Sequence, residues 1–193
     1  VVTMSVNWEH IPAKHRSLIK AFLDEADMSA DAIKTVEYPP VYGADIVVSC
    51  EKAKDPKNGS IYLKPTQFVL GIGCRRNTAF ENIDRAIRQS LLKLQIDISD
   101  IDMIASIDVK KDEPGIKEFC DRNRIEFVTY TADELMAVQG EFSASQFVRE
   151  HVGVDNVCER AAVLACSREC NEAGELIYKK HKYDSVTVAA ARY

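Results

Sequence analysis

Apolar segments of strand length alternate with helical segments through the last two-thirds of the chain, and this alternation limits the fold more than any other feature. Three such strands are predicted at Phe68–Ile72, Met103–Asp108 and Ile125–Tyr130, and a helical segment follows each of them. Strands connected through helices pair in parallel, and the helices cover the sheet. Glu175–Lys179 and Ser185–Ala191 follow with a short connection, which predicts an antiparallel hairpin. The sequence therefore predicts an α/β fold, a three-layer sandwich with a mixed, mostly parallel sheet and a C-terminal hairpin.

The helical segments carry recognisable start and end signals. Pro114 suits a first helical turn, and its helix is expected to reach about Asn123. Another helix is expected over Val157–Ser167, with Asn156 as its N-cap and Gly153 as the left-handed end of the helix before it. Capping boxes of the Ser/Thr-x-x-Glu/Gln form are predicted at residues 78–81, 131–134 and 143–146.

Residues 1–66 are less regular, and we expect them to form an N-terminal extension or the end of a preceding domain, with residues 67–193 as the main domain. The first stretch is predicted to be helical, because Leu18 and Phe22 follow Pro12 at helical spacing. The other expected elements are a short helix at Ser29–Val36 and strands at Ala44–Cys50 and Ile61–Leu63. The chain does not begin with Met, which indicates a fragment, a processed product or a trimmed chain.

The chain carries 30 acidic and 25 basic residues, a net charge of −5, so it lacks the basic excess that nucleic-acid binding requires. Its longest apolar runs are far too short to cross a bilayer, and Val1–His10 lacks the pattern of a signal peptide. These features predict a cytoplasmic protein in which the six cysteines stay reduced. Cys166 and Cys170 are four residues apart in a predicted helix, but two thiols make a poor zinc site, so no metal site is predicted.

The segment from Gly71 to Thr78 is the first candidate for a binding site. It connects a predicted strand to a helix, and ligands of open α/β sheets bind beyond the carboxyl ends of strands. Gly71 and Gly73 allow a tight turn, and the free N–H groups of a helix start attract anions. Arg75 and Arg76 add guanidinium groups suited to carboxylates. A plain turn with solvated arginines is the alternative, and the nucleotide-binding motifs are incomplete, so we predict an anion site of another kind.

Three further segments carry groups for proton transfer or anion binding. Asp108–Gly115 connects another strand to a helix and contributes acids and amines, although a solvated charged loop is the simpler interpretation. Within residues 150–159, His151 and Glu159 are candidates for acid–base chemistry. A basic cluster at Lys179–Tyr183 either binds an acidic ligand or forms a solvated turn.

Four segments, in the same order, resemble the C-terminal domain of the CbiG/CobE family of cobalamin-biosynthesis proteins. These segments are Val69–Arg76, Ser106–Gly115, Phe147–Val154 with Val157–Ala162, and Lys180–Tyr183 with Val186–Ala189. The similarity runs from about Gln67 to Arg192. Residues 1–66 are similar to the end of the region that precedes this domain in two-part CbiG proteins, so the resemblance favours CbiG over CobE.

The resemblance implies a cobalt-precorrin-5A hydrolase of the anaerobic cobalamin route. Such an enzyme opens the ring-A lactone with water, releases acetaldehyde and yields cobalt-precorrin-5B. The resemblance does not itself identify the catalytic residues, and Glu113 and Glu159 are our candidate bases for this reaction. The substrate-binding residues that it implies are Gly71, Gly73, Cys74, Arg75, Arg76, Lys110, Lys180 and Lys182.

Cobalt is carried by the substrate in this reaction, so no cofactor is expected. The implied partners are the anionic cobalt-tetrapyrrole substrate, other enzymes of the cobalamin pathway and a second copy of the chain in a homodimer, with neither nucleic acid nor a membrane among them. Two alternatives stay open. One is a non-catalytic tetrapyrrole-binding or carrier module of the same pathway, and the other is an unrelated phosphate-binding α/β domain.

Overall fold

The computed structural model describes residues 1–11, 13–28, 33–49, 60–63, 66, 68–170 and 174–193. The chain divides into two compact units. The N-terminal unit consists of Val1–Thr66 with Glu169–Glu172, and the C-terminal unit consists of Gln67–Arg168 with Ala173–Tyr193. Each unit has its own sheet, so each is described by itself.

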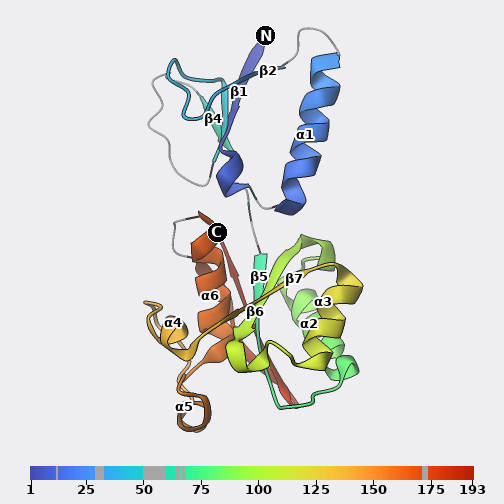
Figure 1. The fold of residues 1–193 in the computed structure, drawn as a ribbon, viewed down its shortest axis with the longest axis vertical. Helices are drawn as coiled ribbons and strands as arrows, with labels where there is room; N and C mark the ends of the chain where they lie inside the picture. Colours follow the sequence, from blue (N-terminus) through green and yellow to red (C-terminus); the bar gives the residue numbers. More distant parts are fainter. Residues whose placement is uncertain (12, 29–32, 50–59, 64–65, 67, 171–173) are drawn as a thin grey trace. The chain divides into compact units, whose positions relative to one another are not determined.

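The N-terminal unit is built on a parallel sheet with the strand order β2-β1-β3-β4. Its elements are β1 (Val2–Val6), η1 (Trp8–His10), α1 (Ala13–Met28), β2 (Ile33–Val36), β3 (Ile46–Val48) and β4 (Ile61–Leu63). Met4, Val6 and Val48 form its core together with Ile11. Figure 1 shows α1 beside this sheet.

One prediction for the N-terminal unit is wrong, and one strand was not predicted. Ile33–Val36 forms strand β2 in place of a second short helix, and Val2–Val6 forms strand β1 ahead of the predicted first helix. The two strands pair in parallel from Val2 opposite Ile33 onward, so long-range pairing outweighs the local helical signal. The proposed cap of that helix, Ser29, lies outside the described residues, whereas α1 and the strand at Ile61–Leu63 are confirmed.

The C-terminal unit has a five-stranded sheet with the order β7-β6-β5-β9-β8. Its strands are β5 (Phe68–Cys74), β6 (Ile101–Ile107), β7 (Glu126–Tyr130), β8 (Glu175–Tyr183) and β9 (Val186–Arg192). β5, β6 and β7 pair in parallel, and β9 is antiparallel to both β5 and β8. Four of the five strands therefore run in one direction and β9 runs against them. This confirms the predicted mixed, mostly parallel sheet and its C-terminal hairpin.

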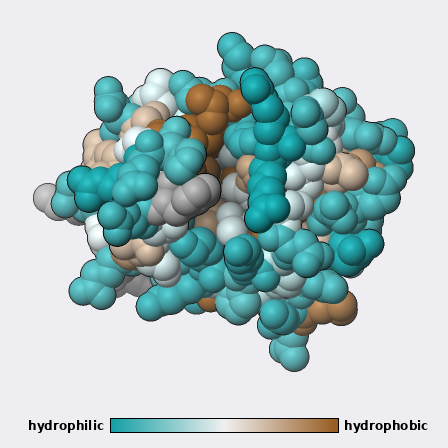
Figure 2. Space-filling view, turned by 90° about the horizontal axis from the view of Figure 1, so that it is seen from below, coloured by the Kyte–Doolittle hydropathy of each residue, from teal (hydrophilic) through white to brown (hydrophobic). Residues whose placement is uncertain are grey.

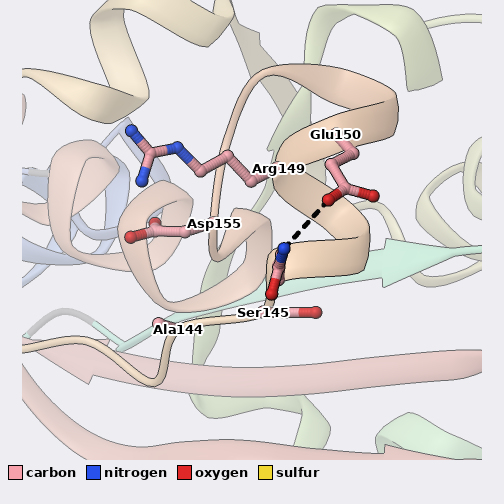
Figure 3. A pocket seen from close by; sticks show the side chains of 6 residues that line it. Ala144, Ser145, Arg149, Glu150 and Asp155 are labelled. Atoms are coloured by element: carbon pink, nitrogen blue, oxygen red, sulfur yellow. Dashed lines mark hydrogen bonds between the residues drawn. The ribbon is translucent and has the colours of Figure 1, made fainter.

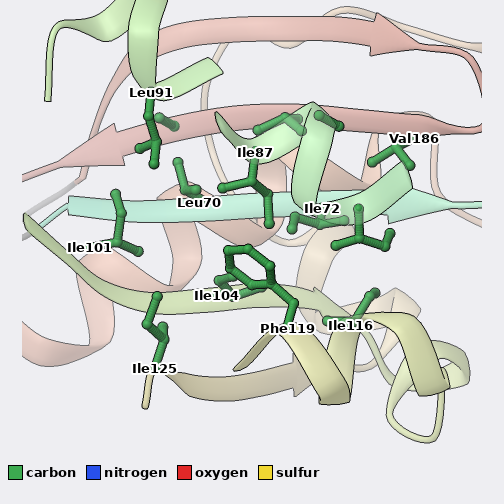
Figure 4. Close-up of a cluster of buried hydrophobic side chains, with 14 of the residues drawn as sticks. Leu70, Ile72, Ile87, Leu91, Ile101, Ile104, Ile116, Phe119, Ile125 and Val186 are labelled. Carbon is green, nitrogen blue, oxygen red and sulfur yellow. The ribbon is translucent and has the colours of Figure 1, made fainter. Parts of the chain in front are cut away.

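Helices cover both faces of this sheet. They are α2 (Phe80–Leu94), α3 (Pro114–Asn123), α4 (Ala132–Met136), α5 (Gln146–Val152) and α6 (Val157–Cys170), with short 3-10 turns η2 (Ile98–Asp100) and η3 (Asp108–Lys110). In Figure 1, α2 and α3 lie on one face and α6 on the other, which is the expected three-layer arrangement. The main core lies under α2 and α3 (Figure 4), and its members include Leu70, Ile72, Ile87, Leu91, Ile104 and Phe119.

One of the three predicted capping boxes forms. Thr131 and Glu134 cap α4 reciprocally, as the sequence predicts. The box at residues 78–81 is wrong, because α2 begins after Ala79 and the Thr78 hydroxyl donates instead to the carbonyl of Arg75. The box at residues 143–146 is also wrong, since Ser145 is the N-cap of α5 and has no side-chain capping bond.

The junction between α5 and α6 follows the sequence closely. Gly153 ends α5 with a φ of 75°, in the left-handed region where glycine is favoured. Asn156 Oδ1 accepts a hydrogen bond of 2.9 Å from the backbone N–H of Glu159 and so caps α6. Among the helices that the structure describes, none is long and apolar enough to cross a membrane.

Candidate functional site

The carboxyl ends of β5 and β6 meet at one edge of the sheet. The two strands are neighbours and parallel, with Gly71 opposite Ala105, so the residues that follow them share an edge. The bend at residues 74–78 follows β5, and η3 with residues 111–113 follows β6. Figure 2 views the protein from below, toward the end of β5, and hydrophilic side chains cover most of this surface.

The bend after β5 exposes both arginines that the sequence singled out. Arg75, Arg76 and Asn77 are exposed, and Asn77 has a φ of 58°. The Arg75 N–H donates to the carbonyl of Ser185, at 3.0 Å, and the Thr78 hydroxyl donates to the carbonyl of Arg75, at 2.7 Å. The bend is therefore fixed against the turn of the β8–β9 hairpin. The backbone N–H of Arg75 is already hydrogen-bonded to Ser185 and is not available to a ligand. The exposed guanidinium groups of Arg75 and Arg76 are the anion-binding groups that this bend offers to solvent.

A buried ion pair lies at the same edge. Lys110 Nζ is 3.2 Å from Glu113 Oε2, and the two side chains are only 15% and 5% exposed. Glu113 is the N-cap residue of α3, although its side chain makes no capping bond. The other carboxylate oxygen of Glu113, Oε1, is buried and has no hydrogen-bond partner among the described residues. The segment is thus divided, since Lys110 and Glu113 are largely buried while Val109, Lys111 and Asp112 are exposed to solvent, and its role in binding stays a prediction.

Cys74, the last residue of β5, lies next to this ion pair. Burial raises the pKa of the Cys74 thiol to about 11, and the charge of Glu113 adds to this rise while Lys110 opposes it. The thiol is therefore protonated and neutral at neutral pH. The raised pKa argues against a thiolate nucleophile at Cys74, and its predicted contact with substrate stays a prediction.

Gly115 holds the two halves of this edge together. A Cβ atom on Gly115 would lie 2.4 Å from the carbonyl oxygen of Thr78, so the start of α3 packs directly against the segment that follows the bend. Only glycine allows this approach of one backbone to another. The Lys110–Glu113 pair and the bend at residues 74–78 are consequently fixed with respect to each other.

Gly71 and Gly73 lie within β5, before the bend, so the prediction that they allow a tight turn is wrong. Gly71 is buried against the backbone of α6, where a Cβ atom would lie 1.7 Å from the carbonyl oxygen of Cys158. A Cβ atom on Gly73 would lie 2.6 Å from Thr187 Oγ1 on the neighbouring strand. Close packing of the sheet thus accounts for both glycines, and their predicted contact with substrate stays a prediction.

Glu159, the second candidate base, is fully buried near the start of α6. Its Oε1 accepts hydrogen bonds from the Ser143 hydroxyl and the Lys180 N–H, and its Oε2 accepts one from the Ser143 N–H. Both oxygens are therefore engaged by protein donors. This arrangement ties the segment before α5 to strand β8, which gives Glu159 a structural role that sequence reasoning missed.

The basic residues of β8 differ in how far they are exposed to solvent. Lys182 is exposed, whereas Lys180 is half-buried and its backbone N–H is held by Glu159. The structure does not join these lysines to Arg75 and Arg76 through any contact among the described residues. Binding of substrate by Lys180 and Lys182 stays a prediction.

A pocket that sequence reasoning missed lies beside α5. It has a volume of about 520 Å³ and is lined by Ala144, Ser145, Gln146, Arg149, Glu150 and Asp155. Figure 3 shows these side chains and the hydrogen bond of 3.1 Å from Gln146 to Glu150. Asp155 also receives two hydrogen bonds from Arg160, which lower the pKa of its carboxyl group. The only feature of the sequence that points to this pocket is the mixture of acidic and basic side chains within residues 149–155.

The described residues include no group of three or more His, Cys, Asp or Glu side chains that could hold a metal ion. The side chain of Cys170 lies outside the described part of the structure, so the distance between the Cys166 and Cys170 thiols is not defined. Cys158 and Cys166 are both buried, and burial raises the pKa of the Cys158 thiol to about 12.

The fold and the site together define an α/β domain with cationic side chains and a buried Lys–Glu pair at the carboxyl edge of its sheet. Residues 68–191 match the family described as "Cobalamin synthesis G C-terminus". The chain therefore belongs to this CbiG-type family of cobalamin-synthesis proteins, as its sequence motifs predict.

Relatives of known name agree with this assignment. The probable cobalt-precorrin-5A hydrolase of Methanocaldococcus jannaschii is 31% identical over 137 residues, which cover 68% of this chain and 42% of the relative. The cobalt-precorrin-5A hydrolase of Salmonella typhimurium is 33% identical over 126 residues, which cover 65% of this chain and 34% of the relative. The chain thus spans less than half the length of the curated hydrolases that it matches.

Two solved structures share the fold. The crystal structure of CobE, a protein from the cobalamin biosynthetic pathway, has a TM-score of 0.63 and 25% identity, covering 67% of this chain and 92% of that one. A putative cobalamin biosynthesis protein G homolog from Sulfolobus solfataricus has a TM-score of 0.53 and 18% identity, covering 100% of this chain and 51% of that one. The second similarity concerns the fold alone.

Proposed function

We propose that this chain acts in cobalamin biosynthesis as a cobalt-precorrin-5A hydrolase or as the C-terminal part of one. The observation that supports the proposal most directly is the position of the site. The exposed Arg75–Arg76 pair and the buried Lys110–Glu113 pair share one sheet edge, and both lie inside residues 68–191, which match the cobalamin-synthesis family.

The proposed reaction begins with hydrolysis of a ring-A lactone. The oxygen of water bonds to the lactone carbonyl carbon, the bond from that carbon to the ring oxygen breaks, and a carboxyl group and a hydroxyl group result. The former C20 carbon, which carries this hydroxyl, then leaves with its methyl group as acetaldehyde and cobalt-precorrin-5B remains. The cobalt is a part of the substrate throughout.

The substrate's charge explains why an acidic chain needs this cationic edge. A corrinoid intermediate carries several peripheral carboxylates, and a planar guanidinium group binds a carboxylate through two parallel hydrogen bonds. Arg75 and Arg76 stand free in solvent on a bend that is fixed at both ends, so little ordering is needed when a carboxylate binds.

The test is anaerobic incubation of the chain with cobalt-precorrin-5A while acetaldehyde is measured. We expect release by the wild-type chain, and substrate binding at least ten-fold weaker in the double variant Arg75→Ala/Arg76→Ala with unchanged unfolding. The matched control is Arg88→Ala/Arg192→Ala, which removes the same charge from α2 and from the far end of β9, opposite Phe68. Equal affinity of the two double variants would contradict the anion site.

One observation favours a second candidate, a non-catalytic tetrapyrrole-binding module. The region that resembles CobE covers 92% of that protein, so a domain of this kind also exists without the remainder of a hydrolase. Tight binding of cobalt-precorrin-5A by the wild-type chain, with no acetaldehyde released, would favour this candidate over the hydrolase.

A further inference from the structure

One oxygen of the Glu113 carboxylate lacks the partner that a buried oxygen needs. Oε2 accepts from Lys110, while Oε1 is buried with no hydrogen bond from any described residue. Leaving a buried acceptor unsatisfied costs roughly 1–3 kcal/mol, more if it is charged, so such groups normally bind water or a ligand. The Glu113 side chain is only 5% exposed, so bulk solvent does not supply the missing hydrogen bond to Oε1.

The surroundings of Glu113 suit a held water molecule. The site lies at the carboxyl ends of β5 and β6, where ligands of such sheets bind. The protonated Cys74 thiol lies close enough to feel the charges of Lys110 and Glu113, and Gly115 fixes the segment against the bend that carries the arginines. A water molecule on Oε1 would therefore lie near the ligand and be shielded from bulk solvent.

Lys110 determines how the carboxylate is placed. Its ammonium group neutralises the charge of Glu113 and, by occupying Oε2, leaves Oε1 as the oxygen that faces an additional donor. Glu159 offers no comparable opening, since Ser143 and Lys180 occupy both of its oxygens. Of the two candidate bases, only Glu113 has a carboxylate oxygen without a hydrogen-bond partner among the described residues.

Resting on the proposed function, we propose that Glu113 is the catalytic base of the lactone hydrolysis and that Lys110 is its positioning residue. Oε1 holds the attacking water and takes one of its protons as the water oxygen bonds to the carbonyl carbon. When the bond to the ring oxygen breaks, Glu113 returns this proton to that oxygen. The carboxylate is then ionised again, and the product holds one added molecule of water.

The test compares variants of the full chain in the acetaldehyde assay. We expect Glu113→Ala to lower kcat by at least 100-fold with KM changed less than three-fold. Sodium formate should raise the kcat of this variant at least ten-fold, because formate supplies a carboxylate in the space that the side chain leaves. The control is Glu118→Gln, an exposed residue of the same helix, which should retain full activity. Far-UV circular dichroism confirms that each variant is folded.

Lys110 is tested by rescue. Lys110→Met should lower kcat about ten-fold or more, and Lys110→Arg, which keeps the cation, should recover most of this loss. A glutamate with a purely structural role would give no formate-dependent rate.

The two proposals fail in distinguishable ways. An active wild-type chain whose Glu113→Ala variant stays within ten-fold of it, or is insensitive to formate, overturns this inference alone. A wild-type chain that binds cobalt-precorrin-5A without releasing acetaldehyde overturns the inference that it carries a working catalytic base, and a wild-type chain that does not bind it overturns the proposed function as well.

Discussion

Gly71 of β5 and Cys158 of α6 are in backbone-to-backbone contact, and this contact sets the distance between the sheet and the helix. A Cβ atom at Gly71 would lie 1.7 Å from the Cys158 carbonyl oxygen and 3.0 Å from the Ala162 nitrogen. Neither is the end of a flexible side chain, so α6 must move if residue 71 gains a methyl group. We expect Gly71→Ala to lower the free energy of unfolding by about 3 kcal/mol or more, measured by urea denaturation.

Gly73→Ala is the matched control for this prediction. It makes the same change two residues along the same strand, but its Cβ atom would meet Thr187 Oγ1, the end of a side chain that can rotate. The loss should therefore stay below about 1.5 kcal/mol. Equal losses in the two variants would show that the contact with α6 is not the constraint.

Glu159→Gln is expected to destabilise the protein through Ser143 and Lys180. The carboxylate accepts three hydrogen bonds from these two residues, and a glutamine would direct an NH₂ group at one or more of the donors. Hydrogen bonds to charged groups contribute roughly 1.5–3 kcal/mol each, so we expect a loss of about 3 kcal/mol in urea unfolding.

The control for Glu159 is Glu150→Gln, an exposed residue of α5 that accepts a single hydrogen bond from Gln146. Its effect should remain within about 0.5 kcal/mol. Loss of acetaldehyde release in Glu159→Gln without any loss of stability would contradict the structural role and return Glu159 to the list of candidate bases.

The strand and helix order of the C-terminal unit could be read from the sequence because each element has a strong local pattern. Helix α3 begins at Pro114 and ends at Asn123 as predicted, and the apolar run from Phe68 marks β5. Strands β1 and β2 could not be found in this way. Their short segments are stabilised by pairing with each other, which links Val2 to Ile33 across the whole of α1.

The capping boxes show why a local motif is not sufficient. Thr131 and Thr78 have the same spacing to a glutamate, yet only Thr131 caps its helix. Thr78 lies one residue before Ala79, the N-cap of α2, and its hydroxyl donates to the Arg75 carbonyl within the bend. We expect Thr131→Ala to cost about 1 kcal/mol in urea unfolding and Thr131→Ser to cost less than half of that, because serine keeps the capping oxygen.

The sequence predicts where a candidate site lies, but it does not predict which of the candidate residues are buried. Strand ends in α/β sheets bind ligands, and this rule led to Arg75, Arg76 and Glu113. The unpaired oxygen of Glu113 depends on how α3 packs against Thr78, and the three bonds of Glu159 join segments that are far apart in the sequence. Both are properties of the folded chain, which no residue spacing encodes.

Asp155 and Arg160 should make the stability of the C-terminal unit depend on pH. Hydrogen bonds from Arg160 hold the pKa of Asp155 below its ordinary value of 3.8. Above that value Asp155 is ionised in both states, and the stabilisation by Arg160 is complete. As the pH falls below it, the unfolded chain takes up the proton first, so the stabilisation decreases and is lost once the pH has passed through the folded pKa.

The difference in unfolding free energy between the wild type and Asp155→Asn should accordingly be constant from about pH 5 to 7 and shrink below about pH 4. Urea unfolding of both proteins across this range measures it. Arg160→Met serves as the background for a double-mutant cycle, which cancels the separate loss of the hydrogen bonds from Arg160 to the carbonyls of Leu135 and Val138. If Arg160 causes the shift, Asp155→Asn in that background should lose most of its pH dependence. A pH dependence as large as in the wild type would assign the shift to another neighbour of Asp155.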